Sequence, residues 1–390
     1  MESRYGIIDL DALGYNFSAI KHTVGSALIM AIVKANAYGH GIVECSLYLQ
    51  AQGANYLGVA LIEEAITLRN AGITLPILVL GGVMVEQVPL FLQYDIEIMA
   101  SSIDKLLAID ACASKHGKKA KIHLKIDTGL GRIGVRYKNA EQFFMTAINL
   151  LSIDIIGVAS HFATADDQDL SYMQLQCARF HEVTQFFPLH GLPMPLRHMA
   201  NSGAIMQMPE SYFDMVRPGI MLYGVYPQSW MQSLFFIKPV MSLYARVVYF
   251  KVVLQGAGIS YGLTWKAEQD SRVITLPIGY GDGYPRALSN KGCVLLHGKK
   301  YPLVGNICMD QMMVNIGSDS AYCGDEVVLL GKSGNLQLTI NDLVDCYGGS
   351  AYEFMVLLNS RIARRYQLQA EHLLTPTILY HEKIIQNSTV

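Results

Sequence analysis

A lysine, Lys34, stands where a buried strand is expected to end. The apolar run Leu28–Val33 leads directly into it, and Tyr38 follows four positions later among small, turn-prone residues. Lysine is seldom buried, because removing its charge from water costs free energy. A desolvated lysine loses its proton more easily and becomes a nucleophile that can form a Schiff base. A lysine that extends from the strand end into water remains the alternative.

Other reactive residue types also follow apolar runs. They are Arg132 within Asp127–Gly134, His161, Asn201-Ser202-Gly203, and Arg217-Pro218-Gly219-Ile220. Each alone has a simpler interpretation: a buried core histidine, a surface ion pair, or a helix cap. Together they form a pattern, because each lies at the carboxyl end of an expected strand.

Eight short apolar runs alternate with amphipathic stretches in the first 235 residues. The runs are Leu28–Val33, Tyr56–Ala60, Pro76–Leu80, Ile96–Met99, Lys121–Asp127, Ile153–His161, Leu196–Ala200 and Met215–Ile220. The amphipathic stretches are Ile42–Gln52, Ile62–Ala71, Val85–Gln93, Ile103–His116, Ala140–Leu151 and Leu170–Phe187. This alternation predicts βαβ units, and eight of them predict an α/β fold of the TIM (β/α)8 barrel type. A doubly wound open sheet is the alternative, but no G-x-G-x-x-G sequence follows an early strand.

The loops after the seventh and eighth runs predict an anion site. Barrel enzymes often bind phosphate there, and Ser202, Gly203 and Gly219 offer a hydroxyl and accessible backbone N–H groups. A possible imine-forming lysine opposite a phosphate site indicates pyridoxal phosphate, an aldehyde that carries a phosphate.

The chain of 390 residues is long enough for two domains, which we expect at 1–235 and 236–390, with the first few residues able to join the second. A formal net charge of −2 argues against nucleic-acid and membrane partners. The 7 cysteines form no C-x-x-C pair, so we expect reduced thiols, a cytoplasmic location and no metal. No secretory signal or membrane-spanning run is apparent in the sequence.

Glycine turns and short strands dominate after Phe236, which predicts a β-rich second domain. The expected strands are Val240–Leu254, Arg272–Pro277, Cys293–His297, Gln311–Ile316 and Val327–Leu330, and Ala351–Tyr366 is an expected helix. Three stretches could be chemical or merely structural, as a loop aromatic, a turn and a helix cap: Tyr261 within Gly258–Trp265, Asn306–Gln311, and Ser350–Glu353.

Taken together, these stretches resemble the alanine racemases, pyridoxal-phosphate enzymes of fold type III. The resemblance covers nearly the whole chain. It rests on Val33–Gly41, Lys125–Gly134, His161–Asp166, Ala200–Ser202, Arg217–Ile220, Ser260–Gly262, Cys308–Gln311 and Tyr352-Glu353.

The resemblance implies a role for each of these residues. Lys34 would hold pyridoxal phosphate through an imine and act as one base, and Tyr261 of a partner subunit would act as the opposing base. The phosphate ligands would be Tyr38, Ser202, Gly219, Ile220 and Tyr352. Arg217 would face the pyridine nitrogen, with His161 near Arg217 and Tyr261. Arg132 would contact the phenolic oxygen and help to bind the substrate, Lys125 matches a position that relatives carbamylate, and Met309 would bind the substrate carboxylate across a homodimer interface.

These residue types suit racemisation. One base must take a proton from one face of Cα while another returns a proton to the opposite face. A free lysine or tyrosine has a pKa near 10, so both must be tuned downward by cations and burial. An arginine at the pyridine nitrogen should keep the ring neutral, which limits side reactions such as transamination.

The chain departs from the family pattern in a few places. Asn306 replaces a usual arginine near the entrance, Arg361–Arg364 contains Ala363 in place of a proline, and Val356 replaces a common cysteine. Asp166, His198, Arg286 and Arg364 match other entrance positions.

The expected function is interconversion of L-alanine and D-alanine for peptidoglycan. A serine or broad-specificity racemase of the same fold is the alternative. A non-catalytic pyridoxal-phosphate carrier would lack the second domain, and a decarboxylase would not be expected to combine Arg217 with a tyrosine base.

Overall fold

Eight parallel strands close into a barrel in the first part of the chain. The computed structural model describes residues 2–368. The strands neighbour one another in the order β5-β4-β3-β2-β10-β9-β8-β6, and a β5–β6 pairing closes the ring. Their bounds are β2 (Leu28–Ile32), β3 (Tyr56–Val59), β4 (Ile77–Val79), β5 (Glu97–Ala100), β6 (Ala120–Asp127), β8 (Ile153–Ala159), β9 (Leu196–His198) and β10 (Met215–Val216). The predicted (β/α)8 barrel is confirmed.

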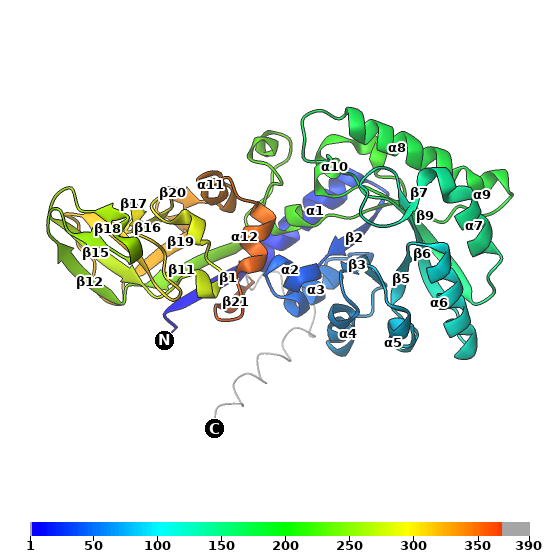
Figure 1. The fold of residues 1–390 in the computed structure, drawn as a ribbon, viewed down its shortest axis with the longest axis horizontal. Coiled ribbons are helices and arrows are strands. Elements are labelled where there is room, and N and C mark those ends of the chain that lie inside the picture. The colour runs from blue at the N-terminus through cyan, green and yellow to red at the C-terminus, as the bar shows by residue number, and fades with distance from the viewer. Residues whose placement is uncertain (1, 369–390) are drawn as a thin grey trace, which may run out of the picture.

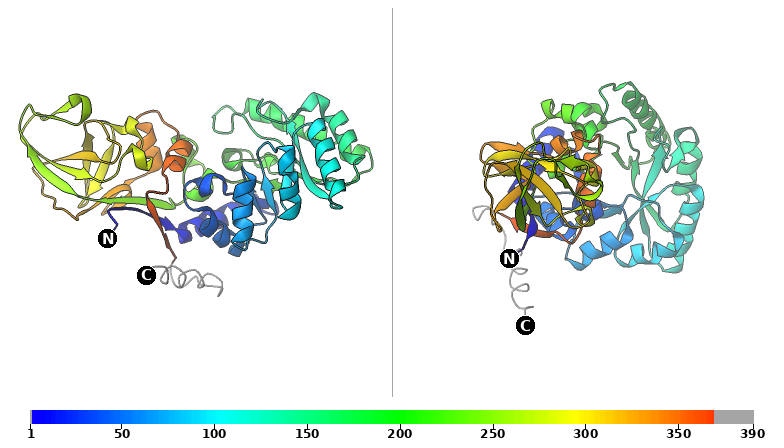
Figure 2. Two further views of the ribbon diagram at one scale, coloured as in Figure 1. Left: turned by 60° about the horizontal axis from the view of Figure 1, so that its bottom comes forward. Right: turned by 60° about the vertical axis from the view of Figure 1, so that its left-hand side comes forward.

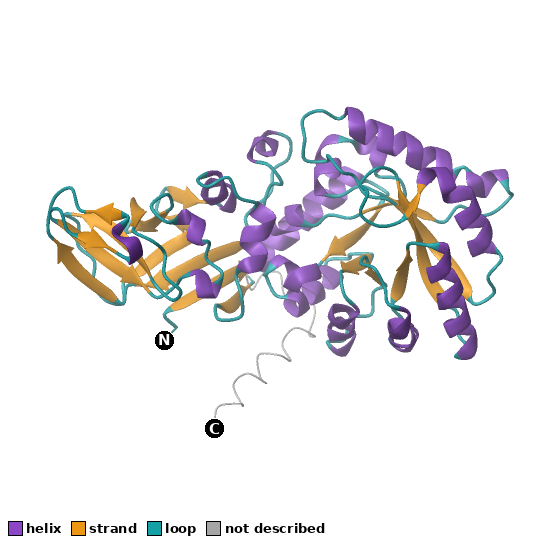
Figure 3. Cartoon of the chain, in the orientation of Figure 1, coloured by secondary structure: helices purple, strands orange, loops and turns teal. Residues whose placement is uncertain are grey.

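Helices surround these strands (Figure 1). They are α3 (Ile42–Ala51), α4 (Ile62–Asn70), α5 (Val88–Gln93), α6 (Ile103–Lys115), α7 (Ala140–Ile148), α8 (Ser171–Thr184), α9 (Phe186–Leu189) and α10 (Ser202–Gln207). Figure 3 shows that helices form the outer layer of this lobe and strands dominate the other lobe. Side chains at the helix starts fix some boundaries; at α6, for example, Ser102 accepts a hydrogen bond from the Lys105 N–H.

A second lobe is built from a long, mostly antiparallel sheet. Its order is β12-β15-β18-β17-β16-β19-β11-β1-β21, with β20 beside β19. The bounds are β1 (Arg4–Asp9), β11 (Met241–Arg246), β12 (Tyr249–Val253), β15 (Ser271–Leu276), β16 (Cys293–Leu296), β17 (Lys299–Val304), β18 (Met312–Gly317), β19 (Glu326–Ser333), β20 (Leu336–Leu338) and β21 (Ala363–Gln367). The predicted run Val240–Leu254 is therefore two strands, β11 and β12. Residues 369–390 of the predicted second domain lie outside the described residues.

The expected helix at Ala351–Tyr366 is wrong in its second half. Helix α12 (Ala351–Leu357) ends after two turns, and β21 follows it. Strand β21 pairs in parallel with β1, from Tyr5 opposite Ala363 to Asp9 opposite Gln367. Pairing with a strand more than 350 positions earlier decides the conformation here, and no local periodicity reports such a partner.

Helix α1 (Leu10–Val24), which connects the β-rich sheet to the first barrel strand, was not anticipated from the sequence. The Asp9 carboxylate accepts from the Ala12 N–H at 2.9 Å and begins the helix. Buried Asn16 then donates to the Leu222 and Lys238 carbonyls at 3.0 and 2.8 Å. Helix α1 therefore fixes the barrel against the start of the second lobe, and Figure 2 shows the two lobes joined at this region.

No helix within residues 2–368 is long and apolar enough to cross a membrane. The 7 cysteines are all free thiols in the structure.

Candidate active site

A cavity of about 870 Å³ opens at the carboxyl ends of the barrel strands. This is the size of a site for a small molecule with a cofactor. The barrel residues predicted for the site line it together: Lys34, Tyr38, Lys125, Arg132, His161, Ser202, Arg217, Gly219 and Ile220. Helix α12 adds Tyr352, Glu353 and Val356 from the second part of the chain.

Lys34 begins a left-handed turn, α2 (Lys34–Tyr38). The φ angles of Ala35, Asn36, Ala37 and Tyr38 lie between 51° and 55°. Such a conformation costs about 1 to 2 kcal/mol for each residue that carries a Cβ atom. Surrounding contacts must therefore hold the turn in place, and the turn directs Lys34 to the cavity wall.

Three side chains stabilise this turn. The Glu64 carboxylate accepts from the Ala35 N–H at 2.6 Å, and its other oxygen accepts from Ala60 at 2.8 Å. The Asn36 amide oxygen accepts from the Ile42 N–H at 2.9 Å. Fully buried His40 donates from Nδ1 to the Ala37 and Tyr38 carbonyls at 3.1 and 2.9 Å. The polar residues after Lys34 are thus explained by the backbone that they hold.

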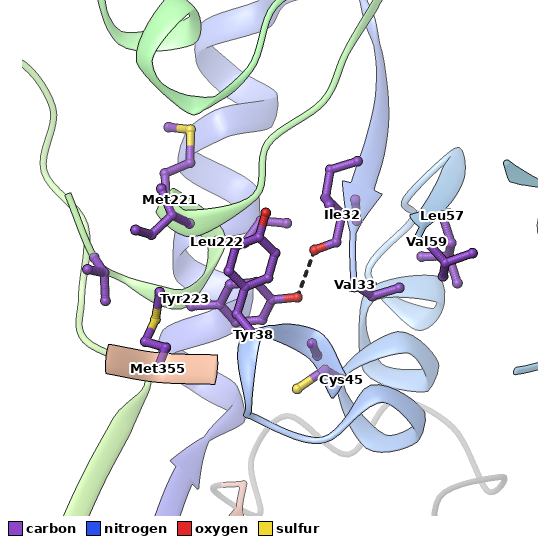
Figure 4. Packing of buried hydrophobic residues seen from close by; sticks show 14 of the residues in the cluster. Ile32, Val33, Tyr38, Cys45, Leu57, Val59, Met221, Leu222, Tyr223 and Met355 are labelled. Carbon is purple, nitrogen blue, oxygen red and sulfur yellow. Dashed lines mark hydrogen bonds between the residues drawn. The ribbon is translucent and has the colours of Figure 1, made fainter. Parts of the chain in front are cut away.

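The turn also fits closely against the second part of the chain. Gly39 has φ 81°, and a Cβ atom there would lie 2.3 Å from the Met355 carbonyl oxygen of α12. Tyr38 lies beside Tyr223, with 5.1 Å between ring centroids, and Tyr223 donates to the Ile32 carbonyl at 2.9 Å (Figure 4). The position of Lys34 therefore depends on contacts from several distant segments.

Positive charge concentrates around Lys34. Burial lowers the pKa of the Lys34 ammonium, Arg132 and Arg217 lower it further, and Glu64 opposes the change. Burial also lowers the pKa of Lys125 well below its usual value, with Arg217 and Arg132 adding to the effect. Both amines lose their protons more readily than free lysines, which is what a nucleophile or a base requires.

The predicted phosphate ligands meet on one side of the cavity. The Asn201 side chain caps α10 by accepting from the Ala204 N–H. The Ser202 hydroxyl is therefore not needed as the helix cap and contacts the loop after β10. Ser202 Oγ accepts from the Gly219 N–H at 3.0 Å. A Cβ atom on Gly219 would lie 2.6 Å from the Tyr38 hydroxyl, so only glycine leaves this space open. Neither the Tyr38 nor the Tyr352 hydroxyl has a hydrogen-bond partner among residues 2–368.

Arg217 is almost completely buried at the cavity wall. Its guanidinium donates to His198 Nδ1 at 2.9 Å and to His161 Nδ1 at 3.0 Å. It also donates to the Ser160 and Met199 carbonyls at 2.7 and 3.1 Å. A guanidinium has five N–H groups, and the Nε hydrogen of Arg217 has no acceptor within the described residues. Arg217 therefore lines the cavity with one N–H group that has no acceptor in the described part of the chain.

Arg132 lies in a loop that Asp127 shapes. The Asp127 carboxylate accepts from the Gly129 and Gly131 N–H groups at 2.9 and 3.1 Å. This local turn brings the exposed Arg132 to the same cavity as Lys34, whose pKa it lowers.

Tyr261 and Met309 do not line the cavity of their own chain. Their side chains are 74% and 54% exposed on the second lobe. The Asn306 amide donates to the Tyr261 carbonyl at 2.7 Å, and Ser260 Oγ donates to the Asn306 carbonyl at 2.5 Å. Asn306 thus joins the two loops that carry Tyr261 and Met309.

Only one of the four expected entrance residues lines the cavity. Asp166 does so, and burial raises its pKa to about 6. The prediction that His198 lies at the entrance is wrong. This residue is fully buried, because it ends β9 with its ring inside the barrel. Arg286 is exposed on the second lobe, and Arg364 binds the Gly39 carbonyl behind the cavity.

Sequence reasoning missed the polar residues that support the site. Glu64 is the third residue of α4, and its carboxylate accepts from the backbone N–H of the N-cap Leu61 at 3.1 Å; a glutamate at this position is a readable signal of a helix start. His123 stands two positions before Lys125 on β6, and this alternation indicates that both face the barrel interior. Glu97 opens β5 and gives no comparable signal.

Comparisons with known proteins agree with the geometry. The family model for the alanine racemase N-terminal domain matches residues 8–227, and the model for the C-terminal domain matches residues 240–366. An alanine racemase of Halothermothrix orenii is 40% identical over 92% of this chain and 96% of its own length. One of Carboxydothermus hydrogenoformans is 41% identical over 92% and 98%.

Solved structures show the same architecture. The alanine racemase from Streptomyces lavendulae has a TM-score of 0.91 at 35% identity, covering 95% of this chain and 99% of its own. A histidine racemase from Leuconostoc mesenteroides has a TM-score of 0.86 at 30% identity, covering 94% and 98%.

Proposed function

The chain belongs to the alanine racemase family, and on that premise we propose which residues carry out its reaction. The protein is a racemase that interconverts L-alanine and D-alanine. The observation that supports our assignment best is the placement of Lys34, with its lowered pKa, and the buried donor Arg217 on one cavity.

Pyridoxal phosphate fits this cavity. The unpartnered hydroxyls of Tyr38 and Tyr352, the space beside Gly219, and Ser202 together offer a place for the phosphate, with the backbone of Ile220 beside them. Arg217 would offer an N–H group to the pyridine nitrogen, and Arg132 would offer its charge to the phenolic oxygen. When bound, the cofactor supplies an electron sink that makes the Cα proton of an amino acid acidic.

Lys34 would hold the cofactor and would exchange the proton on one face of the substrate. Burial, Arg132 and Arg217 lower its pKa, so the neutral amine that accepts a proton forms more readily than on a free lysine. Arg132 lies beside it and can bind the substrate carboxylate. Lys125, whose pKa is also lowered, is a candidate for carbamylation because a neutral amine is the form that reacts with carbon dioxide.

Tyr261 serves the opposite face from a second copy of the chain. It cannot act in its own cavity, because it lies exposed on the other lobe and does not line that cavity. A homodimer in which Tyr261 and Met309 enter the partner's cavity would give each site two bases and a backbone donor. His161 would then lie between Arg217 and the partner's loop.

The biological role follows from the product. D-Alanine is a building block of peptidoglycan, and we assign the enzyme to its supply in the cytoplasm. The free thiols fit a reducing compartment.

Mixed dimers test the assignment. Chains with Lys34→Ala and chains with Tyr261→Phe should each be nearly inactive. Denaturing and refolding them together should restore activity, because some dimers then hold one intact site. Each variant denatured and refolded alone is the control. No recovery would show that each site is built within one chain.

Substrate choice is tested in deuterated water. L-Alanine should lose optical rotation and gain deuterium at Cα, with L-serine and L-histidine assayed in parallel. If either competitor exchanges faster than alanine, that amino acid is the main substrate and the assignment to alanine fails. Release of carbon dioxide would indicate decarboxylation.

A further inference from the structure

A chain of hydrogen bonds runs from Arg217 into the barrel interior. Arg217 Nη1 donates to His198 Nδ1 at 2.9 Å, and His198 Nε2 lies 2.8 Å from His123 Nδ1. His123 Nε2 lies 2.7 Å from a carboxylate oxygen of Glu97. All four side chains are at most 5% exposed. We call these four residues the interior relay.

The two ends of the interior relay fix every proton between them. A guanidinium only donates, so His198 Nδ1 must accept and its proton must lie on Nε2. That Nε2–H donates to His123 Nδ1, which places the His123 proton on Nε2 as well. An ionised carboxylate only accepts, so Glu97 is the matching terminus. Both histidines are therefore neutral and share one tautomer.

The backbone makes room for this relay. Strand β8 lies between β6, which carries His123, and β9, which carries His198. At the crossing point stands Gly157, where a Cβ atom would lie only 2.4 Å from His123 Nδ1. Any larger residue at Gly157 would displace the ring atom that joins the two histidines.

Glu97 is the carboxylate that the relay connects to Arg217. Burial and Arg132 lower the pKa of Arg217 to about 9, so its guanidinium remains charged at neutral pH. Within residues 2–368 this charge forms no direct ion pair. Apolar layers usually fill a barrel of this type, so an internal carboxylate needs a partner. No group of three or more His, Cys, Asp or Glu residues in the described part of the chain is arranged to hold a metal.

We propose that Glu97 and His123 are positioning residues, which fix the His198 tautomer and so hold the Arg217 guanidinium in place at the cavity wall. Without this terminus, His198 could turn its protonated nitrogen toward Arg217 and lose the bond. The inference rests on the proposed function, because it assigns Arg217 to the cofactor's pyridine nitrogen.

The first test needs no substitution. Nitrogen-15 NMR of the holoenzyme, with labelled histidine, distinguishes a protonated from a bare ring nitrogen. His123 and His198 should each show a protonated Nε2 and a bare Nδ1. A proton on Nδ1 of His198, or on both of its nitrogens, would overturn the proposal.

The second test compares two changes at Glu97. Glu97→Leu removes the acceptor, so we expect the visible circular dichroism of bound pyridoxal phosphate to change and kcat to fall about tenfold, with KM changing less than about twofold. Glu97→Gln keeps an acceptor oxygen and should restore the histidine tautomers and most of kcat. A folded Glu97→Leu holoenzyme with unchanged circular dichroism and kcat would refute the proposal, as would a Gln variant as impaired as the Leu variant.

A matched control stands two positions earlier. Asp95 is exposed and pairs with Lys121 at 2.8 Å, outside the interior relay. Asp95→Asn makes the same carboxylate-to-amide change and should leave the spectrum and kcat unchanged. If the wild-type protein bound no pyridoxal phosphate, the proposed function would fail, whereas the same NMR measurement on the cofactor-free protein would still report the histidine tautomers.

Discussion

The two proposed bases lie in regions of opposite character. Lys34 is partly buried at the start of a left-handed turn that Glu64, Asn36 and His40 hold in place. Tyr261 is 74% exposed on a loop of the second lobe, and within its own chain that loop is held chiefly by Ser260 and Asn306.

This difference shows how the site is divided. One half of the proposed site is preorganised inside a single chain, with its charges and its backbone already fixed. The other half is presented to the outside, which is what a residue needs if it is to enter a neighbouring cavity. Changes near Lys34 should therefore affect folding and chemistry together, whereas changes near Tyr261 should affect chemistry with much smaller effects on folding.

The largest effects should come from the bases themselves. Lys34→Ala should abolish the visible imine absorbance of bound pyridoxal phosphate and reduce racemisation about a thousandfold or more. Tyr261→Phe should reduce racemisation by about a hundredfold to ten thousandfold and leave that absorbance intact. Absorption spectra and polarimetry measure both. Imine absorbance surviving in the lysine variant would remove the distinction between the two regions.

A matched pair of glycine substitutions should separate the regions next. Gly39→Ala should lower the free energy of unfolding by roughly 3 to 4 kcal/mol, because its Cβ would meet the Met355 carbonyl at 2.3 Å and φ is positive. Gly262→Ala, beside Tyr261, also has a positive φ, but its nearest atom is 3.6 Å away. It should cost only about 1 kcal/mol. Urea denaturation measures both, and equal losses would contradict the comparison.

Acid should weaken the Lys34 region through His40. Burial lowers the pKa of His40 from 6.5 to about 4, so between these values the unfolded chain binds a proton that the native protein does not. Stability from neutral His40 is complete above pH 6.5 and is lost as the pH falls toward 4, by up to about 3 kcal/mol.

Urea midpoints at pH 6.5 and 4.5 measure this loss. His198 and His161 are also buried with lowered pKa values and contribute to the same slope. His40→Gln, whose amide can still donate to a carbonyl, should therefore reduce the pH dependence without removing it. An unchanged slope would exclude His40 as a contributor.

The smallest effect should appear at Asn306. Asn306→Ala removes the 2.7 Å hydrogen bond to the Tyr261 carbonyl. An exposed hydrogen bond contributes about 1 kcal/mol, so kcat should fall about threefold to fivefold while the melting temperature stays nearly constant. Asn315→Ala, a similar change on β18 of the same lobe, serves as the control. A large loss of stability would show that the Tyr261 loop is a structural element.

The barrel and most of the cavity wall can be predicted from the amino-acid sequence. Parallel strands that are covered on both faces consist mostly of consecutive apolar residues, and the eight apolar runs of the sequence correspond to the eight barrel strands. Reactive residues directly after such runs must lie at one rim of a barrel. The order of residue types along the chain therefore suffices to place Lys34, Arg132, Ser202 and Arg217 around one cavity.

The backbone of Lys34, the end of α12 and the interior relay depend instead on tertiary contacts. The left-handed turn depends on Glu64, 29 positions after Ala35, and β21 forms because β1 pairs with it. His123 is hydrogen-bonded to Glu97, which lies 26 positions away in the sequence, and to His198, which lies 75 positions away. Local periodicity reports which face of a strand is buried, but not which distant side chain will be met there. That choice is made by the closure of the barrel.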